Sequence, residues 1–461
     1  MLSINNCMND CGQHPTTPQT RREFLTEFGS GFGGLSLAAL YGIDATTAEA
    51  VSPLAAKAPH FPVKAKAIIQ LFASGAPSHV DTFDYKPELQ KRDGMKGDYG
   101  NLLASPFEFP KFGKSGLQIS EVWSKLGQHA DSMAIINSMF TEIPDHGIAQ
   151  KMMNTGSTQL PKPSVGSWMV YGLGTTNQNM PGFITLNGSP EWRQCAFLPG
   201  MFQGCNVNYR STMRAEDILS NIRSENSTLE RQRRQIDFSN MLNQQHMIKL
   251  QKDIQLESRI ESFETAFKMQ TEATDAFDLT KEPANIKELY GAGEEASKMI
   301  VARRLVERGV RFVQVHVGGY DHHSDIKNAM SNTARRYDQP FAALLTDLKQ
   351  RGLLDSTLVM WGGEFGRTVT AGGGAGAPGR DHNGKAFSVW MAGGNVKGGQ
   401  RYGETDETGG KAVKDLVHIH DLHATMLHLM GFDHTKLTYN YNGREFRLTD
   451  NFGNVIKELI A

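Results

Sequence analysis

Residues 310–323 read VRFVQVHVGGYDHH and residues 357–367 read TLVMWGGEFGR, and these two stretches decide the expected fold. In each, an apolar run typical of a buried strand ends in paired glycines and is followed at once by acidic or basic side chains. An open α/β sheet builds its ligand site beyond the carboxyl ends of its strands. The two stretches therefore predict a site at one edge of such a sheet.

The sequence around these stretches alternates between helical and strand-like segments. We expect helices over 294–307 and 333–350, each followed by a glycine, Gly309 or Gly352. Further strands are expected at 67–73, 133–137, 183–186 and 386–392. This order predicts the α/β class, with a mostly parallel central sheet that carries helices on both faces.

Composition excludes some classes of partner. The chain has 461 residues, with 48 Lys and Arg against 49 Asp and Glu and a formal net charge of -1. No overall field therefore attracts nucleic acid or an anionic membrane surface. We expect one α/β domain over 63–461 with a helical insertion at about 214–290. The insertion could bind a protein partner or cover the sheet as a solvated hairpin, and its apolar spacing favours the second.

The first fifty residues predict export. Arg21 and Arg22 precede a glycine-rich apolar stretch at 28–41, and an A-x-A type cleavage site follows at 48–50. We interpret 1–50 as a twin-arginine signal peptide and expect a periplasmic or otherwise exported protein. The apolar stretch is too short to span a membrane, so no transmembrane segment is expected in the mature chain. Cys195 and Cys205 could then pair or stay free.

Candidate metal ligands gather after the predicted strands. Asp321 and His323 are two residues apart, so an extended backbone puts both on one face, where they could reach the same ion, while His322 points elsewhere. Glu364 follows the next strand. Asp381 and His382 form a third cluster, and Arg367 and Arg380 are suited to hold an oxyanion.

Three further residues are candidates on weaker grounds. His79 and Asp81 follow the first strand and could complete the metal site. Thr141 lies between a strand and the expected start of a helix, whose positive end would stabilise a nucleophile and a phosphate. The alternative for Thr141 is a threonine in a polar turn.

Five motifs, in order behind the arginine pair, resemble those of a large bacterial family called domain of unknown function 1501. They are GAPSHVDTFD at 75–84, GGYDHH at 318–323, GEFGRT at 363–368, GRDH at 379–382 and DLHAT at 421–425. That family is in turn distantly similar to the alkaline phosphatase and sulfatase superfamily. The resemblance implies a sheet between helices and two metal ions, usually zinc, near a serine, threonine or formylglycine nucleophile.

The resemblance also assigns residues. Asp321 and His323 resemble an Asp-x-x-x-His ligand pair at shorter spacing, Glu364 stands where the superfamily has Asp-His, and His382 resembles a later single ligand. The segment from Thr141 to His146 looks like the nucleophile segment of the nucleotide pyrophosphatase branch. The superfamily's first-strand aspartate is replaced by Ala73 and Ser74, and no segment for formylglycine formation is present.

Together these observations predict an exported, metal-dependent hydrolase of phosphate or sulfate esters, with divalent ions, zinc by resemblance, and a small anionic ester as substrate. The rival hypothesis is a non-catalytic envelope binding protein that keeps the fold and uses the insertion for a partner. Convergence of Asp321, Glu364 and His382 at one place would favour the hydrolase.

Overall fold

The computed structural model describes residues 52–461, except 99, 160, 219–227, 251–259, 261–262, 266, 270–271 and 374–375. The predicted signal peptide at 1–50 lies outside the described residues, which belong to one unit, Ser52–Ala461. Within the described part of the chain, we find no helix with the length and apolar character that crossing a membrane requires.

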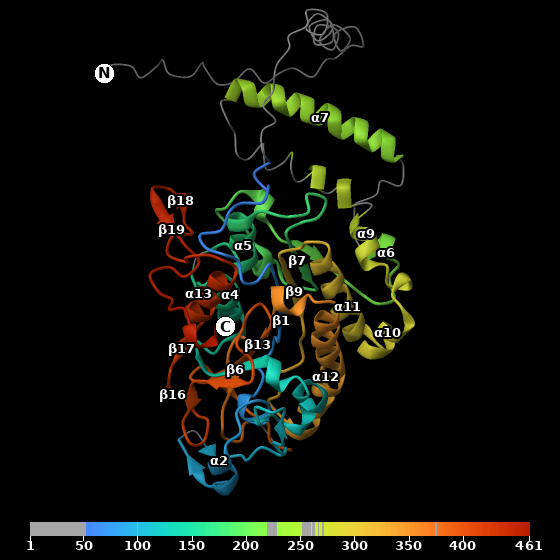
Figure 1. Ribbon diagram of the computed structural model, residues 1–461. Coiled ribbons are helices and arrows are strands. Elements are labelled where there is room, and N and C mark those ends of the chain that lie inside the picture. The colour runs from blue at the N-terminus through green and yellow to red at the C-terminus, as the bar shows by residue number, and fades with distance from the viewer. Residues whose placement is uncertain are drawn as a thin grey trace, which may run out of the picture. The chain divides into compact units, whose positions relative to one another are not determined.

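A nine-stranded sheet forms the centre of the fold (Figure 1). Its order is β14-β6-β13-β10-β1-β9-β7-β8, and β17 also pairs with β6. Of its pairs, β10–β13 and β13–β6 are antiparallel and the others are parallel. The sheet is therefore mostly parallel, as predicted, with β13 running against its neighbours. The strands are β1 Ala67–Phe72, β6 Met133–Phe140, β7 Phe183–Leu186, β8 Cys205–Val207, β9 Phe312–His316, β10 Thr357–Gly362, β13 Phe387–Ala392, β14 Gln400–Tyr402 and β17 Val417–His418.

Helices cover both faces of this sheet because successive strand residues point to opposite sides. Ile69 and Leu71 of β1 belong to a core shared with α10 (Ala284–Tyr290), α11 (Glu294–Glu307) and α12 (Ile326–Gln350). Ile68 and Phe72 belong to a second core, shared with α4 (His146–Thr155), α5 (Val165–Leu173) and α13 (Ile419–Leu429). The α/β class with helices on both faces is thus confirmed.

Short elements complete the fold. They are α2 Pro87–Lys91, α3 Ser124–Gly127, β2 Lys96–Gly97 with β3 Gly100–Asn101, β4 Lys111–Phe112 with β5 Leu117–Gln118, β11 Gly366–Arg367 with β12 His382–Asn383, β15 Glu404–Thr405 with β16 Ala412–Lys414, and β18 Tyr439–Tyr441 with β19 Arg444–Phe446. The pair β11 and β12 matters for the site, because it sets Arg367 opposite His382.

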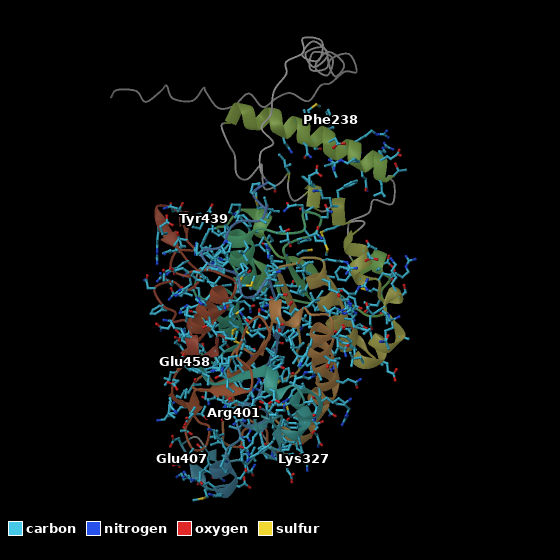
Figure 2. All side chains as sticks on the ribbon, in the orientation of Figure 1. Phe238, Lys327, Arg401, Glu407, Tyr439 and Glu458 are labelled. Carbon is cyan, nitrogen blue, oxygen red and sulfur yellow. The ribbon has the colours of Figure 1, made fainter. Side chains whose placement is uncertain are left out.

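The insertion contains α6 Ala215–Ile218, α7 Leu229–Leu250, α9 Glu272–Phe277 and α10. Its later part is anchored to α11 through Glu282, which forms ion pairs with Arg303 and, at 2.7 Å, with Arg304. Helix α7 leaves Phe238 and Leu242 about half exposed, at 45% and 46% (Figure 2). One part of the insertion therefore covers the core as expected, and α7 does not bury these two side chains.

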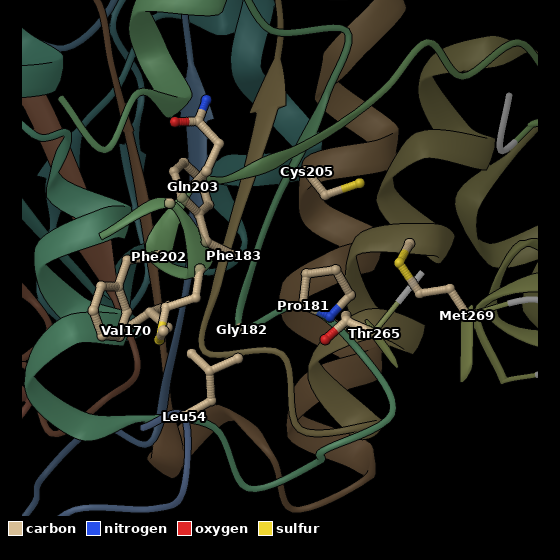
Figure 3. Close-up of a pocket in the computed structure, with 12 residues that line it drawn as sticks. Leu54, Val170, Pro181, Gly182, Phe183, Phe202, Gln203, Cys205, Thr265 and Met269 are labelled. Carbon is tan, nitrogen blue, oxygen red and sulfur yellow. The ribbon is translucent and has the colours of Figure 1, made fainter. Parts of the chain in front are cut away.

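An apolar cavity of about 310 Å³ lies beside β7 (Figure 3). Phe183 and Cys205, the first residues of β7 and β8, line it together with Leu54 and Met269. The cavity therefore lies at the amino ends of these parallel strands, away from the edge where the candidate ligands were expected. Cys205 and Cys195 are both free thiols, so they do not form the disulfide that the sequence left open.

Candidate metal centre

The candidate site forms where β1, β9 and β10 end. Asp321 and His323 follow β9, and Glu364 follows β10. Because β13 runs in the opposite direction, His382 precedes this strand and still reaches the same edge. The three clusters predicted from the sequence thus meet at one edge of the sheet. Two of them follow a strand, and the third precedes one.

Three imidazoles in the site have their Nδ1 atoms fixed by oxygen acceptors. The Nδ1–H groups of His146, His323 and His382 donate to Glu364 Oε1 at 2.7 Å, Asp381 Oδ1 at 3.0 Å and Pro144 O at 2.9 Å, respectively. A neutral imidazole that donates from Nδ1 keeps the lone pair on Nε2. Metal-binding histidines in proteins are held in the same way.

The three Nε2 atoms converge on one carboxylate oxygen. Asp321 Oδ1 lies 3.4 Å from Nε2 of His146, 3.0 Å from that of His323 and 3.7 Å from that of His382. Ligands at the usual zinc distances would lie about 3.3–3.6 Å apart in a tetrahedron. Asp321 and the imidazoles of His146 and His382 therefore offer three donor atoms that one divalent cation could bind, and His323 lies beside Asp321 and His382.

Further observations bear on this fit. Nε2 of His146 is buried and makes no hydrogen bond within the described part of the chain. Nε2 of His323 lies 3.1 Å from Nε2 of His382 and 3.2 Å from Nη1 of Arg367, which donates to it, so a cation bound by His323 would take this lone pair from Arg367. Ligand atoms of His146, Asp321 and His382 all lie within 4.8 Å of one another.

The surroundings of Asp321 and His382 keep these two ligands in binding form. Burial lowers the pKa of His382, which keeps its ring neutral. Partial burial alone would raise the pKa of Asp321, but the hydrogen bond and charge of Arg367 outweigh it and hold this pKa below its usual value. The hydrogen bond that His146 donates to Glu364 raises the pKa of His146 against the effect of burial. Asp321 is thus an anion at neutral pH.

His146 is positioned by a helix that is fixed at both ends. It is the first residue of α4, where Asp145 caps the helix by accepting from the backbone N–H of Ile148 at 3.1 Å. At the other end, Nε2 atoms of His420 and His423 in α13 donate to the carbonyls of Gly156 at 2.9 Å and Met153 at 2.8 Å. The ring of His146 therefore projects from a helix that α13 holds in place.

Residues 65–460 match the family described as protein of unknown function, DUF1501. The chain belongs to this family. The resemblance drawn from the five motifs is thereby confirmed. No protein of the curated set matches the sequence of this DUF1501 protein.

Several solved structures are similar to this DUF1501 protein at low identity. Ps i-CgsB, solved in complex with k-i-k-neocarrahexaose, is 11% identical, with 79% of this chain and 72% of that chain covered and a TM-score of 0.33. The PsFucS1 sulfatase from Pseudoalteromonas sp. is 12% identical, with coverage of 80% and 68% and a TM-score of 0.33. BT4656, solved in complex with its substrate D-glucosamine-2-N,6-O-disulfate, is 12% identical, with coverage of 87% and 82% and a TM-score of 0.30.

Two predicted ligands of the DUF1501 protein, Glu364 and Asp381, contact Nδ1 of an imidazole, on the other side of the ring from Nε2. Glu364 is fully buried, and its Oε1 accepts from His146, from the backbone N–H of Gly75 at 3.0 Å and from Gln150 at 3.1 Å. Asp381 is exposed and contacts His323. In this geometry Glu364 Oε1 and Asp381 Oδ1 each orient an imidazole, whereas Glu364 Oε2 is buried without a hydrogen-bond partner among the described residues. Direct ligation by these two carboxylates stays a prediction.

Arg367, predicted to hold the substrate anion, has no N–H group left for one. Nε donates to Ala76 O, Nη1 to Arg380 O and His323 Nε2, and Nη2 to Gly75 O and Asp321 Oδ1. These are five bonds, and a guanidinium has five N–H groups. Arg367 therefore fixes the loop after β1 and neutralises Asp321.

His79, Asp81 and Arg380 do not reach the cluster, in contrast to the expectation. Asp81 and Arg380 are fully buried and form an ion pair with Nε to Oδ2 at 2.6 Å. His79 is also buried, and its Nε2 bonds to the carbonyl of Gly409 at 2.7 Å. Asp81 and Arg380 thus satisfy each other, whereas Nδ1 of His79 is buried without a hydrogen-bond partner among the described residues.

The Asp81–Arg380 pair supports a prediction on stability. Arg380→Met is expected to lower the free energy of unfolding by about 3–5 kcal/mol, because it leaves the Asp81 carboxylate buried without its partner. Urea unfolding followed by circular dichroism measures this loss. The double variant Asp81→Leu/Arg380→Met removes both charges and is expected to recover most of it. A single variant as stable as the parent chain would contradict the interpretation.

Thr141, the predicted nucleophile, follows β6 and is 5% exposed. Its backbone N–H donates to Gly384 O at 2.8 Å, and its hydroxyl has no hydrogen-bond partner among the described residues. The structure therefore places no base beside it. The sequence placed His146 in the nucleophile segment and did not predict it as a metal ligand. Its position directly after an N-cap aspartate marks it as the start of a helix.

Proposed function

We propose that this DUF1501 protein is an exported, metal-dependent hydrolase of phosphate or sulfate esters, with His146, Asp321, His323 and His382 as the metal ligands. The observation that carries the proposal is the convergence of three imidazole Nε2 atoms on Asp321 Oδ1, each ring being fixed through Nδ1. The grouping of Asp321 and His382 with His146, whose ring donates to Glu364, also supports the proposal.

The charge of the site favours a divalent cation. Asp321, Glu364 and Asp381 bring three carboxylates, whereas Arg367 brings one guanidinium. A zinc ion or a similar cation held there would polarise an ester oxygen and lower the pKa of bound water. The chain's own contribution is to orient the ligands through Glu364 and Asp381 and to keep Asp321 charged through Arg367.

Elemental analysis together with activity assays tests the proposal. The purified mature protein is expected to contain close to stoichiometric zinc or a similar ion, and to hydrolyse 4-nitrophenyl phosphate or 4-nitrophenyl sulfate. Chelation should remove the activity and added metal should restore it. Absence of metal, with no hydrolysis of either ester after addition of zinc, manganese or magnesium, would overturn it.

Export is tested separately. A variant with Arg21→Lys and Arg22→Lys is expected to stay in the cytoplasmic fraction, because the signal for folded export requires the arginine pair. Cell fractionation and the length of the mature chain measure this. An equal yield of processed protein outside the cytoplasm from the variant and the parent chain would refute export by this route.

One observation favours the non-catalytic alternative, namely the exposure of Phe238 and Leu242 on α7. These residues are four apart and therefore share one face of the helix. Under the alternative, Phe238→Ser with Leu242→Ser would abolish binding of a protein partner while leaving metal content unchanged.

A further inference from the structure

A serine and a histidine lie together beside the candidate metal centre. His316 is the last residue of β9 and pairs in register with Phe72, the last residue of β1. Ser74 comes two residues after Phe72, and its Oγ lies 2.6 Å from Nε2 of His316. Both side chains are half-buried, so solvent reaches the pair. A hydroxyl within hydrogen-bond distance of an imidazole is the arrangement of an activated nucleophile and its base.

The protonation state of the ring suits this arrangement. Burial lowers the pKa of His316, so the imidazole is neutral at neutral pH. A neutral ring with its proton on Nδ1 accepts the hydroxyl proton of Ser74 at Nε2. Trp192 packs against the ring edge to face, with the ring centroids 5.2 Å apart, and keeps His316 in place.

The pair is joined to the metal centre by the next residue. The backbone N–H of Gly75 donates to Glu364 Oε1 at 3.0 Å, and its carbonyl accepts from Arg367 Nη2 at 2.5 Å. Gly75 has a φ of +104°, and a Cβ there would lie 2.6 Å from the backbone nitrogen of Asp321. Only glycine allows the backbone at position 75 to lie so close to the backbone of Asp321, a proposed metal ligand. Ser74 is therefore one residue away from this contact.

A second glycine lies against the pair. A Cβ on Gly318 would lie 3.0 Å from His316 Nε2 and 3.2 Å from Ser74 Oγ. A side chain at this position would therefore crowd both reacting atoms. Glycine at 318 therefore leaves Ser74 Oγ and His316 Nε2 free of a neighbouring side chain at this position.

We propose that Ser74 is the nucleophile of this enzyme and His316 its general base, in place of Thr141. This inference rests on the proposed ester hydrolysis and deepens it. Thr141 has no imidazole or carboxylate hydrogen-bonded to its hydroxyl in the described part of the chain, whereas Ser74 has His316. The serine also stands where the resemblance led us to expect a first-strand aspartate.

The reaction balances without any further reagent. Ser74 Oγ forms a bond to the phosphorus of a phosphate monoester while its proton passes to His316 Nε2. The bond between phosphorus and the alcohol oxygen breaks, and the alcohol leaves with the proton from His316. Water then attacks the seryl phosphate with His316 as base, inorganic phosphate leaves, and the serine hydroxyl is restored.

A fluorophosphonate probe tests the pair without requiring turnover. Oγ of an activated serine displaces fluoride from this reagent, and the proton and fluoride leave as HF. We expect mass spectrometry of the purified full-length mature protein to find the adduct on Ser74, and the adduct to be absent in Ser74→Ala. Ser297→Ala is the control, because Ser297 bonds to the carbonyl of Gly293 in α11 and should not affect labelling.

His316→Gln separates catalysis from structure. Glutamine can keep a hydrogen bond to Ser74 but cannot take its proton, so labelling is expected to slow by about 10²–10⁴-fold while the unfolding midpoint stays unchanged. The His316→Gln variant also tests the proposal if Ser74→Ala does not fold. An adduct on Thr141, no adduct on Ser74 in the folded parent chain, or unchanged labelling in His316→Gln would overturn the proposal.

The outcomes also distinguish this inference from the proposed function. Labelling of Ser74 in a protein without metal or ester hydrolysis would support the pair and refute the metal-dependent hydrolase. Undiminished hydrolysis of 4-nitrophenyl phosphate by Ser74→Ala in a metal-loaded protein would refute the pair and leave the hydrolase standing.

Discussion

Asp321→Ala is expected to remove the bound metal and, with it, the hydrolysis of 4-nitrophenyl esters. Asp321 Oδ1 is the point on which three imidazole Nε2 atoms converge, so no other side chain can replace it. Structural zinc sites with four ligands are worth about 10–16 kcal/mol, so one ligand is worth about 3–4 kcal/mol and its loss should weaken metal binding by about two to three orders of magnitude. Competition with a chromogenic chelator measures this change.

The matched control for this variant is Asp355→Ala. Asp355 is exposed and precedes β10, so it lies at the opposite end of the strand that leads to Glu364. The Asp355→Ala variant removes the same charge as Asp321→Ala and should leave the affinity for metal unchanged. Equal metal affinity in Asp321→Ala and the parent chain would show that the four donors do not form a binding site.

Glu364→Gln is expected to weaken metal binding by about 10–100-fold, although Glu364 is not a ligand in this geometry. Its Oε1 accepts three hydrogen bonds, and the one from His146 fixes both the orientation and the tautomer of that ring. A glutamine amide can turn its nitrogen toward His146, which would favour the proton on Nε2 and remove the lone pair. Isothermal titration with zinc, beside thermal unfolding, measures the effect on binding and on stability.

Asp381→Asn provides the comparison. Asp381 has the same role behind His323, but its side chain is 56% exposed and the contact is screened by solvent. Its effect on metal affinity is expected to be several-fold smaller. If the two variants weakened binding equally, burial of Glu364 would not be what fixes the site.

Much of the fold follows from local pattern. The apolar runs before the glycine pairs are β9 and β10, and the helix before β9 is α11, as expected. Helix α12 begins at Ile326, about two turns before the expected 333, with Asp325 as its N-cap in the left-handed region. The reversal of β13 could not be predicted, because an apolar run carries no information on its direction in a sheet.

The candidate site was predictable to the extent that it depends on spacing. Alternation along an extended segment correctly places Asp321 and His323 together and turns His322 away, toward Thr333. Asp81 was misassigned because its partner, Arg380, is 299 residues away and no local pattern reveals that pairing. The placement of His146 depends on how α4 is docked on the sheet, which is a property of tertiary packing.

The two histidines of α13 that hold α4 have a consequence for how this family tolerates mutation. Residues 419–429 contribute no donor atom to the metal centre, yet His420 and His423 fix the helix from which His146 projects. Substitutions there should therefore be selected against as strictly as substitutions at the ligands. A saturation-mutagenesis map would mark this C-terminal helix as functional, and a fragment that ends before it would lose the geometry of the candidate site along with a piece of core.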